Sequence, residues 1–107
     1  MAGSIAVIDI GSNSIKVLVA DRGPDGGLRV LHSRTIDARI SAGISHAAPQ
    51  LSDAGMERGL QAVRELLTDA TAFSPERTVL VATSAVRDAL NGGEFRRRIH
   101  IATGHDI

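Results

Sequence analysis

Cysteine is missing from this chain, and its absence excludes several kinds of chemistry at once. Without it there can be no disulfide, no thiolate nucleophile and no cysteine-based metal site, a composition that fits a reducing compartment. Tryptophan and tyrosine are missing too, so Phe73 and Phe95 supply all of the Phe, Tyr and Trp content of the 107 residues. The hydrophobic core is therefore expected to rest on Ile, Val, Leu and Ala side chains.

An excess of charge and a long hydrophobic run are also missing. Twelve Lys and Arg residues balance 12 Asp and Glu residues, so no bulk charge draws the chain to nucleic acid or to a membrane surface. No stretch approaches the ~18 consecutive apolar residues of a membrane span, and the N-terminus lacks the basic start and apolar run of a signal peptide. We therefore expect a cytoplasmic protein of one domain at most, with neither a nucleic-acid nor a membrane partner.

What is present is a series of short strand-like segments followed by helical patterns. The first segment, Ile5 to Ile10, is almost wholly apolar, as in a strand buried on both faces. Turn-forming residues separate it from two further segments of this kind, which predicts a β-meander. The three predicted strands cover residues 5–10, 15–20 and 28–36. Residues 41–50 carry Gly, Ser and Pro without periodicity and are expected to form a loop.

A long amphipathic helix is predicted after this loop. Ser52 is a residue type that caps helix N-termini, Asp53 and Glu57 follow where the helix dipole favours acids, and Ser74-Pro75 would stop the helix. Apolar residues recur at spacings of four, three, four and three, which makes one buried stripe. Its members are Met56, Leu60, Val63, Leu67 and Ala70.

One more strand and a short helix are predicted next. Residues 78–82 form another β-branched run, and Thr83 or Ser84 can cap a short helix that continues through Leu90. A strand that follows a long helix favours a parallel crossover. The order strand-strand-strand-helix-strand-helix therefore predicts an α/β fold, a mixed sheet with helices packed on it.

A last helix is predicted near the C-terminal end. Asn91 followed by Glu94 resembles a capping box for a helix that ends near Thr103, with Gly104 as its C-cap. Asp106-Ile107 has the character of the start of a further strand. The sheet is therefore expected to be truncated before its last strand.

Asp9 and the turn after it form the first candidate site. Asp9 interrupts an otherwise apolar strand, which costs stability unless the carboxylate is solvated, paired or ligated. In the turn Gly11, Ser12, Asn13 and Ser14, Gly and Asn tolerate positive φ, and backbone N–H groups and hydroxyls can face anionic oxygens. The carboxylate can hold Mg²⁺ beside a phosphate. From position alone, a phosphate site and a plain hairpin turn capped by the aspartate are equal alternatives.

The stretch VLVATSAVRDALN forms the second candidate site. It again joins a buried strand to hydroxyl residues, here Thr83 and Ser84, and then to a helix start whose unpaired amides attract anions. Arg87 would lie near that helix start, where its planar guanidinium could hold a phosphate through two hydrogen bonds. The alternative, which the spacing alone slightly favours, pairs this arginine with Asp88 or Glu94 on a solvated helix face.

Other polar residues give weaker signals. The run Arg96–Arg98 fits a solvated helix face better than a polyanion track, and Lys16 fits an exposed strand position. Arg39 and Gly43 lie at the entry of the predicted loop, where nothing local assigns them a task. The four histidines show no metal-ligand spacing; they are His32, His46, His100 and His105.

The two candidate stretches together resemble one protein family. VIDIGSNSIKVLVAD, followed further along the chain by VATSAVRDALNGGEF, is similar to the exopolyphosphatase / guanosine pentaphosphate phosphohydrolase family, Ppx/GppA. ARISAGI, LSDAGMERGL and TGHDI also look like segments of that family, so the resemblance covers residues 4–107. The family belongs to the actin-like, ribonuclease H-like superfamily with Hsp70 and the sugar kinases. Sugar kinases share the D-x-G turn but are not expected to carry ATSAVRDA.

The resemblance implies a role for each matching residue. Asp9 would lie near a magnesium ion in the first phosphate loop, while Thr83, Ser84 and Arg87 would face the same cleft, with the arginine as a phosphate clamp. Family members release terminal phosphate from polyphosphate or the γ-phosphate of guanosine pentaphosphate, by attack of water on the terminal phosphorus. The residues expected to cradle that phosphoryl group are Gly11, Ser12, Asn13 and Ser14.

The resemblance also implies parts that this chain does not contain. In that family the carboxylate thought to activate the water is a glutamate just after the GHDI-type segment, so the general base is expected beyond Ile107. No catalytic residue is therefore expected within the chain, and a second, glycine-rich phosphate loop is expected later still. Residues 1–107 are accordingly expected to be an incomplete N-terminal Ppx/GppA phosphatase domain that is inactive alone.

Two other hypotheses stay open at this point. One is an actin-like nucleotide-binding or sugar-kinase-type domain, which competition between ATP and polyphosphate would test. The other is a non-catalytic association module, because an unfinished sheet leaves an exposed edge that can pair with another chain. Self-association, for example as a dimer, is therefore expected of this chain and of the full-length protein.

Overall fold

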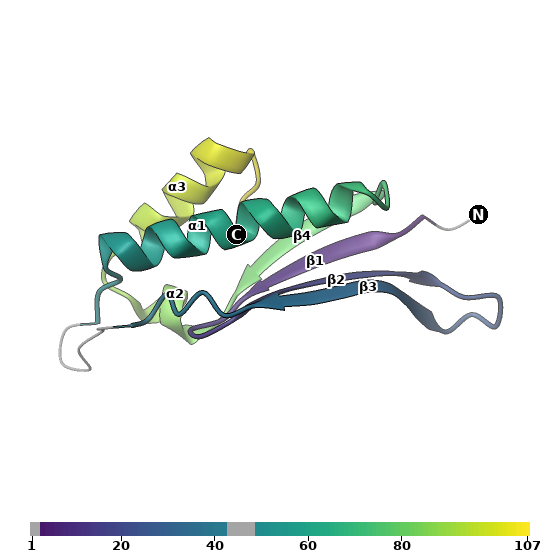
Figure 1. The fold of residues 1–107 in the computed structure, drawn as a ribbon, viewed down its shortest axis with the longest axis horizontal. Coiled ribbons are helices and arrows are strands. Elements are labelled where there is room, and N and C mark those ends of the chain that lie inside the picture. Colours follow the sequence, from purple (N-terminus) through teal and green to yellow (C-terminus); the bar gives the residue numbers. More distant parts are fainter. Residues whose placement is uncertain (1–2, 43–48) are drawn as a thin grey trace.

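The computed structural model describes residues 3–42 and 49–107, which form one four-stranded sheet with helices packed on it (Figure 1). The strands are β1 (Ile5–Ile10), β2 (Ile15–Arg22), β3 (Leu28–Ile36) and β4 (Arg77–Ala82). The helices are α1 (Asp53–Thr71), α2 (Ser84–Asp88) and α3 (Gly92–Thr103). Within these described ranges, none of the helices combines the length and the apolar character that a membrane crossing requires.

The sheet is mixed, and its strand order is β3-β2-β1-β4. Each of the first three strands pairs antiparallel with the next one along the chain, which confirms the predicted meander. The pairing of β2 with β3 shifts register once, between Val19 and Ala20. The fourth strand pairs parallel with β1, so the chain crosses from β3 through α1 to the far side of the meander. The predicted α/β class and the parallel crossover are both confirmed.

In the part of the chain that the structure describes, helices cover one face of the sheet and leave the other open. In β1 the alternate residues Ala6, Ile8 and Ile10 are fully buried, and α1 and α3 lie on that side of the sheet (Figure 1). The residues that alternate with them point to the other face, where Ile5 and Asp9 are exposed and Val7 is half-buried. The prediction that this strand is buried on both faces is therefore wrong for the described residues, because no helix among them covers the second face. That open face is where the side chain of Asp9 lies.

The buried stripe of α1 is wider than the sequence pattern indicated. Leu66 is fully buried, whereas Leu67, a member of the predicted stripe, is only partly buried. Two glycines extend the stripe, and a Cβ on Gly59 would come within 2.9 Å of Ile40 and 2.8 Å of Phe95. This close approach lets Phe95, the core phenylalanine, pack directly against the helix. As expected, the rest of the core is aliphatic.

The N-terminal caps predicted for the two longer helices have different outcomes. Ser52 caps α1 as predicted, because its hydroxyl accepts a hydrogen bond from the N–H of Gly55 at 2.9 Å. Asn91 precedes α3, but its side chain makes no capping bond. Instead its amide exchanges two hydrogen bonds of 2.8 Å with the backbone N–H and carbonyl of Leu51, far away in the sequence. The predicted capping box is therefore wrong, because the Asn91 side chain that would have capped α3 is bound to the segment before α1 instead.

The last residues of the chain do not form the predicted strand. Residues 105–107 have no regular secondary structure, although Gly104 ends α3 in the left-handed conformation as expected. Asp106 lies 2.8 Å from His100 of α3, and Ile107 packs against the core. Among the described residues nothing pairs with the outer edge of β4. Self-association through that edge stays a prediction.

A charged cluster around Asp69 ties β3 to the end of α1. Oδ2 of Asp69 lies 3.0 Å from Nε2 of His32, and Arg34 donates both to this carboxylate and to Glu65. Only 22% of the Asp69 side chain is exposed. The hydrogen bond from His32 is the main reason that the pKa of Asp69 lies below its usual value; Arg34 adds to the effect and burial opposes it.

Acid is expected to remove the stabilisation that Asp69 provides. Its pKa in the folded state lies below the unfolded value of about 3.9, so its contribution is complete above that value and is lost as the pH falls through the lower folded pKa. Asp69→Asn should therefore be less stable than the unsubstituted chain near neutral pH, and the two should converge in acid. Urea unfolding at a series of pH values measures the gap. A gap that stays constant into strong acid contradicts the assignment.

Candidate functional site

The two candidate stretches leave the sheet side by side. β1 and β4 are parallel neighbours, and Ile10 is the register partner of Ala82. The turn 11–14 and the segment that begins at Thr83 therefore start from the same edge of the sheet, where two parallel strands end (Figure 1). Hydrogen bonds join them, because the N–H and the hydroxyl of Thr83 both donate to the carbonyl of Ile10, at 3.1 and 3.4 Å.

Gly11 closes the first turn in a way that a side chain would obstruct. Its N–H donates to the carbonyl of Ser14 at 2.9 Å, and a Cβ at this position would lie 2.9 Å from the same oxygen. Neither Gly11 nor Asn13 adopts the positive φ that the sequence suggested for such a turn. The glycine is needed for the close approach of two backbone segments, and not for an unusual dihedral angle.

Three consecutive N–H groups of this turn have no acceptor within the described part of the chain. They belong to Ser12, Asn13 and Ser14. The carbonyls of the first two are occupied, because Arg39 donates to Asn13 at 2.8 Å and Ser41 donates to Ser12 through its N–H and its hydroxyl. Successive unpaired N–H groups form a concavity that attracts anions. The turn therefore has the donors of a small oxyanion site.

Asp9 lies next to the turn on the open face of the sheet. It is exposed because it alternates with Ile8 and Ile10, whose side chains are buried under the helices. Its register partner on β2 is Lys16, which is exposed on the same face. A carboxylate and an ammonium group are therefore register neighbours on the open face, near the C-terminal end of β1. The sequence pattern left Lys16 without a role because the register of the hairpin was needed to place it.

The donors around Asp9 suit one kind of metal ion and not another. Mg²⁺ keeps several water ligands and is held by one or two carboxylates together with phosphate oxygens. Asp9 provides one exposed carboxylate next to the turn whose N–H groups lack acceptors among the described residues. No group of three or more His, Cys, Asp or Glu side chains converges within residues 3–42 and 49–107. These residues therefore fit a magnesium ion shared with a bound phosphate, and do not fit a metal held by protein ligands alone.

Thr83 and Ser84 begin the second part of the site. Thr83 occupies the N-cap position of α2, but its hydroxyl bonds to Ile10 and makes no capping bond. That contact fixes the end of β4 against the end of β1. Ser84 is the first residue of α2, so its backbone lies at the same edge of the sheet.

Arg87 is exposed in the last turn of α2. No ion pair with Asp88 or Glu94 is found among the described residues, so the alternative interpretation of Arg87 is not supported. Its side chain lines a cavity of about 250 Å³ beside β4, together with Arg96 and Ile107. Because no acid pairs with it among the described residues, this guanidinium is available to an anion.

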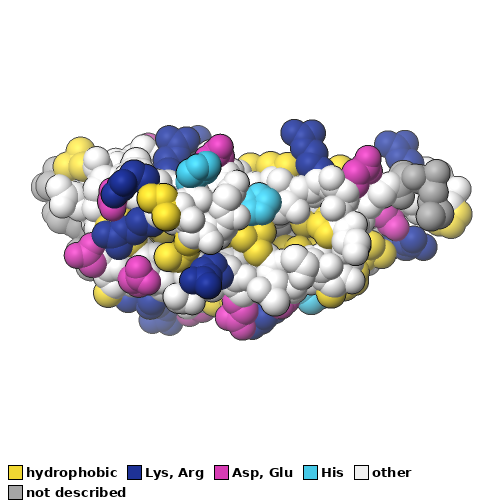
Figure 2. Space-filling model, turned by 90° about the horizontal axis from the view of Figure 1, so that it is seen from above, with side chains coloured by type: hydrophobic (Ala, Val, Ile, Leu, Met, Phe, Trp, Pro, Cys, Tyr) yellow, Lys and Arg dark blue, Asp and Glu magenta, His cyan; other side chains and the backbone are white. Residues whose placement is uncertain are grey.

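The basic run on α3 is mostly neutralised by acids. Glu94 accepts from Arg97 and from Arg98, and Arg98 also contacts Asp53 at 2.9 Å. The hydrogen bond from Arg98, followed by that from Arg97, lowers the pKa of Glu94. Seen from the helix side, acidic and basic side chains are interspersed on the surface (Figure 2). Arg96 and Arg97 are exposed, as predicted for a solvated helix face, whereas Arg98 is half-buried. Arg96 also lines the cavity beside Arg87.

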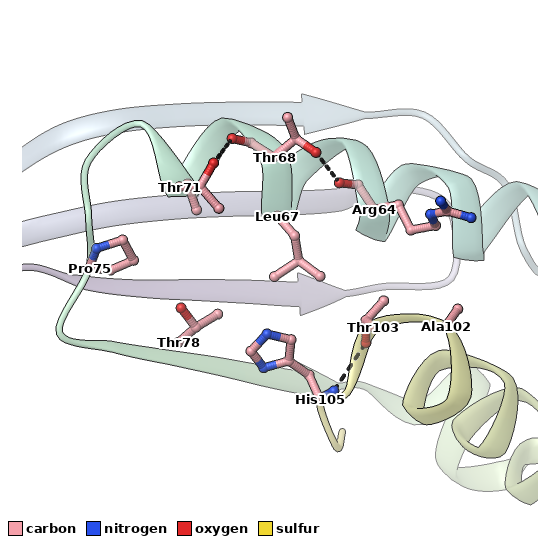
Figure 3. Close-up of a pocket in the computed structure, with 10 residues that line it drawn as sticks. Arg64, Leu67, Thr68, Thr71, Pro75, Thr78, Ala102, Thr103 and His105 are labelled. Carbon is pink, nitrogen blue, oxygen red and sulfur yellow. Dashed lines mark hydrogen bonds between the residues drawn. The ribbon is translucent and has the colours of Figure 1, made fainter.

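A second cavity lies away from the candidate site. It has a volume of about 260 Å³ and is enclosed by α1, the start of β4 and the end of α3. Figure 3 shows His105 directed between Thr78 and Thr103, with Arg64 along the helix above. Because Thr78 is near the beginning of β4 and the turn 11–14 lies beyond its end, this cavity is no part of the site.

The segment after β3 is the part of the site that the sequence pattern did not reveal. Arg39 has a φ of 49°, in the left-handed region, and its N–H reaches the turn at Asn13. The hydroxyl of Ser41 reaches the turn at Ser12. No local pattern marks these contacts, because the partners are almost 30 positions apart. Gly43, named with Arg39 at the sequence level, lies outside the described residues, as does His46.

Known structures share this architecture. The Aquifex aeolicus PPX-GPPA enzyme is 30% identical to the chain, with a TM-score of 0.86 over 97% of this chain and 34% of that protein. An exopolyphosphatase-like protein is 28% identical, with a TM-score of 0.87 over 98% of this chain and 32% of its own. An exopolyphosphatase from Cytophaga hutchinsonii is 22% identical, with a TM-score of 0.88 over 96% of this chain and 32% of its own. At that identity it supports the fold alone. The fold is therefore an actin-like, ribonuclease H-like N-terminal domain.

A family model for the Ppx/GppA phosphatase family matches residues 17–107. The chain belongs to the Ppx/GppA phosphatase family. The matched range begins within β2, so Asp9 and the turn 11–14 precede it, although the structural matches extend over nearly the whole chain. The chain spans about one third of the length of these solved relatives.

Proposed function

We propose that residues 1–107 form the first phosphate-binding wall of a phosphohydrolase that removes terminal phosphate from inorganic polyphosphate or guanosine pentaphosphate. The observation that carries the proposal is the turn 11–14, whose three successive N–H groups lack acceptors among the described residues and lie beside an exposed carboxylate. Membership of a phosphatase family supports a phosphoryl ligand over other anions. The competing sugar-kinase hypothesis has no comparable support from the comparisons.

Each residue of the site has a proposed part in binding the terminal phosphoryl group. The amides of Ser12, Asn13 and Ser14 hold its oxygens, and Gly11 keeps the turn tight enough to aim them. Asp9 holds a magnesium ion that bridges to those oxygens and neutralises their charge. Residues of the second stretch face the same phosphate, with Arg87 as a clamp; they are Thr83, Ser84 and Arg87.

The chemistry needs a group that this chain does not supply. Hydrolysis proceeds by attack of water on the terminal phosphorus, and the donors of the turn stabilise the charge on its equatorial oxygens. Asp9 is assigned to the metal, and Asp37, which directly follows β3 beside the turn, is paired with Arg39 at 3.1 Å. The general-base glutamate is proposed to lie beyond Ile107. The chain alone is therefore proposed to bind phosphate compounds weakly and to turn none over.

Binding of sodium tripolyphosphate with Mg²⁺ tests the proposal. Amide resonances of residues 11–14 should shift on titration, and Asp9→Asn should weaken the Mg²⁺-dependent part of the affinity by about tenfold, because one charged contact is lost. Asp88→Asn is the matched control: it removes the same charge at the same end of the molecule, and its affinity should not change.

Two results would count against the proposal in different ways. If tripolyphosphate leaves the amides of residues 11–14 unshifted, the turn is not the phosphate site. If the purified chain releases phosphate from polyphosphate, the missing base is in fact present. Titration with polyphosphate and with guanosine pentaphosphate in parallel then shows which substrate this half of the cleft prefers.

A further inference from the structure

Arg58 of α1 binds backbone carbonyls, and not an acid, in the segment that contacts the turn 11–14. Its Nε donates to the carbonyl of Ala38 at 2.9 Å, and its Nη2 donates to the carbonyl of Arg39 at 2.8 Å. It forms none of the ion pairs found among the described residues. The guanidinium therefore clamps two successive carbonyls of the segment that follows β3.

That segment has a conformation that needs external support. Arg39 has a φ of 49°, in the left-handed region that residues with a side chain disfavour because Cβ crowds the following carbonyl oxygen. The contacts that compensate this cost come from two sides. Arg58 holds the carbonyl of Arg39, and the turn accepts its N–H at Asn13.

The same segment sets the direction of the N–H groups in the turn. The carbonyls of Ser12 and Asn13 both point to the segment, where they accept from Ser41 and Arg39. In a planar trans peptide the carbonyl of one residue and the N–H of the next point in opposite directions, and no cis peptide is found among the described residues. The N–H groups of Asn13 and Ser14 are therefore directed away from the segment.

We infer that Arg58 is a positioning residue of the phosphate site: it fixes residues 38–41, and through them aims the N–H groups of the turn at the phosphate. This inference rests on the proposed function for its ligand. The hydrogen bonds that carry it are formed without a ligand, so the two ideas can be tested separately. Arg58 itself is assigned no contact with substrate.

The test compares Arg58→Ala, Arg58→Lys and Arg64→Ala. Arg64 lies on the same helix and makes no side-chain hydrogen bond or ion pair among the described residues, so its removal changes the charge equally. In ligand-free protein, amide hydrogen exchange at Arg39 and Ser41 should be about tenfold faster in Arg58→Ala, the change that loss of one ~1.4 kcal/mol hydrogen bond produces. Arg58→Lys should be intermediate, because an ammonium group cannot hold both carbonyls in the same fork. Arg64→Ala should match the unsubstituted chain.

Affinity for sodium tripolyphosphate with Mg²⁺ is measured on the same proteins. Arg58→Ala should weaken it several-fold, with partial recovery in Arg58→Lys and no change in Arg64→Ala. Equal weakening in both alanine variants would mean that affinity depends on net charge alone. Unchanged exchange at Arg39 and Ser41 would mean that Arg58 does not stabilise the segment. Either result overturns the inference. If the unsubstituted chain binds no tripolyphosphate but exchange responds as expected, the proposed function fails while the positioning of the turn stands. Should Arg58→Ala not fold, the comparison of Arg58→Lys with the unsubstituted chain decides.

Discussion

Replacing Phe95 with alanine is expected to lower the free energy of unfolding by about 3–5 kcal/mol, the usual cost of removing a core phenylalanine. The side chain is fully buried, and among the described residues it is the one aromatic side chain in the core. It joins α3 to α1 through the gap that Gly59 leaves open. Because a small domain is stable by only about 5–15 kcal/mol, much of its stability would be lost.

Phe73→Ala is the matched control for that variant. Phe73 is 36% exposed, and its ring stacks on His32 with the ring centroids 5.4 Å apart. Its removal should cost about 1 kcal/mol, a typical value for a partly exposed position. The chain has no Trp or Tyr, so urea unfolding must be followed by circular dichroism and not by intrinsic Trp fluorescence. Equal losses in the two variants would show that Phe95 does not organise the core.

Replacing Gly92 with alanine is expected to cost about 1–3 kcal/mol or more, the range for overpacking. A Cβ at this position would lie 2.1 Å from the carbonyl oxygen of Val86, a backbone atom that cannot move aside cheaply. The corner between α2 and α3 would have to open. Since Arg87 lies in that corner, tripolyphosphate binding should weaken along with stability.

Gly93→Ala, one position later, is expected to have the opposite sign. A Cβ on Gly93 meets nothing within 4 Å, and alanine in a helix is favoured over glycine by about 0.5–1 kcal/mol. The same chemical change at adjacent residues should therefore destabilise in one case and stabilise in the other. Thermal unfolding of the two variants measures the difference. If both stabilise, the close approach of α3 to Val86 does not exist in solution.

Most elements were predictable because their signals are local. The boundaries of β1 and β3 and the start of α1 follow from turn residues, apolar periods and a cap, all within a few positions. The two candidate stretches could be recognised in the sequence because Asp9 interrupts a strand-like run and Thr83 follows one. Their meeting at one edge needed only the parallel pairing of β1 with β4, which the long helix between them already favoured.

The errors arose where a side chain has a distant partner. Asn91 has the residue type and spacing of a capping box, yet its amide pairs with Leu51, 40 positions earlier. Lys16 gave no signal as a neighbour of Asp9 until the register was known. The open face of β1 was missed because a nearly continuous apolar run is typical of a strand buried on both faces, whereas no helix among the described residues covers the second face.

From its residues alone this chain specifies a mixed α/β domain, a tight glycine turn after an aspartate, and a family of phosphatases. Those features depend on residues that are neighbours along the chain, so they can be recognised without knowing how the chain folds. The support beneath the turn is different in kind. The left-handed Arg39, the clamp by Arg58 across 19 or 20 positions and the resulting direction of the turn amides exist only once β3 and α1 have packed together. Hydrogen bonds of that range have no spacing rule, and so tertiary structure alone decided how the turn 11–14 is held.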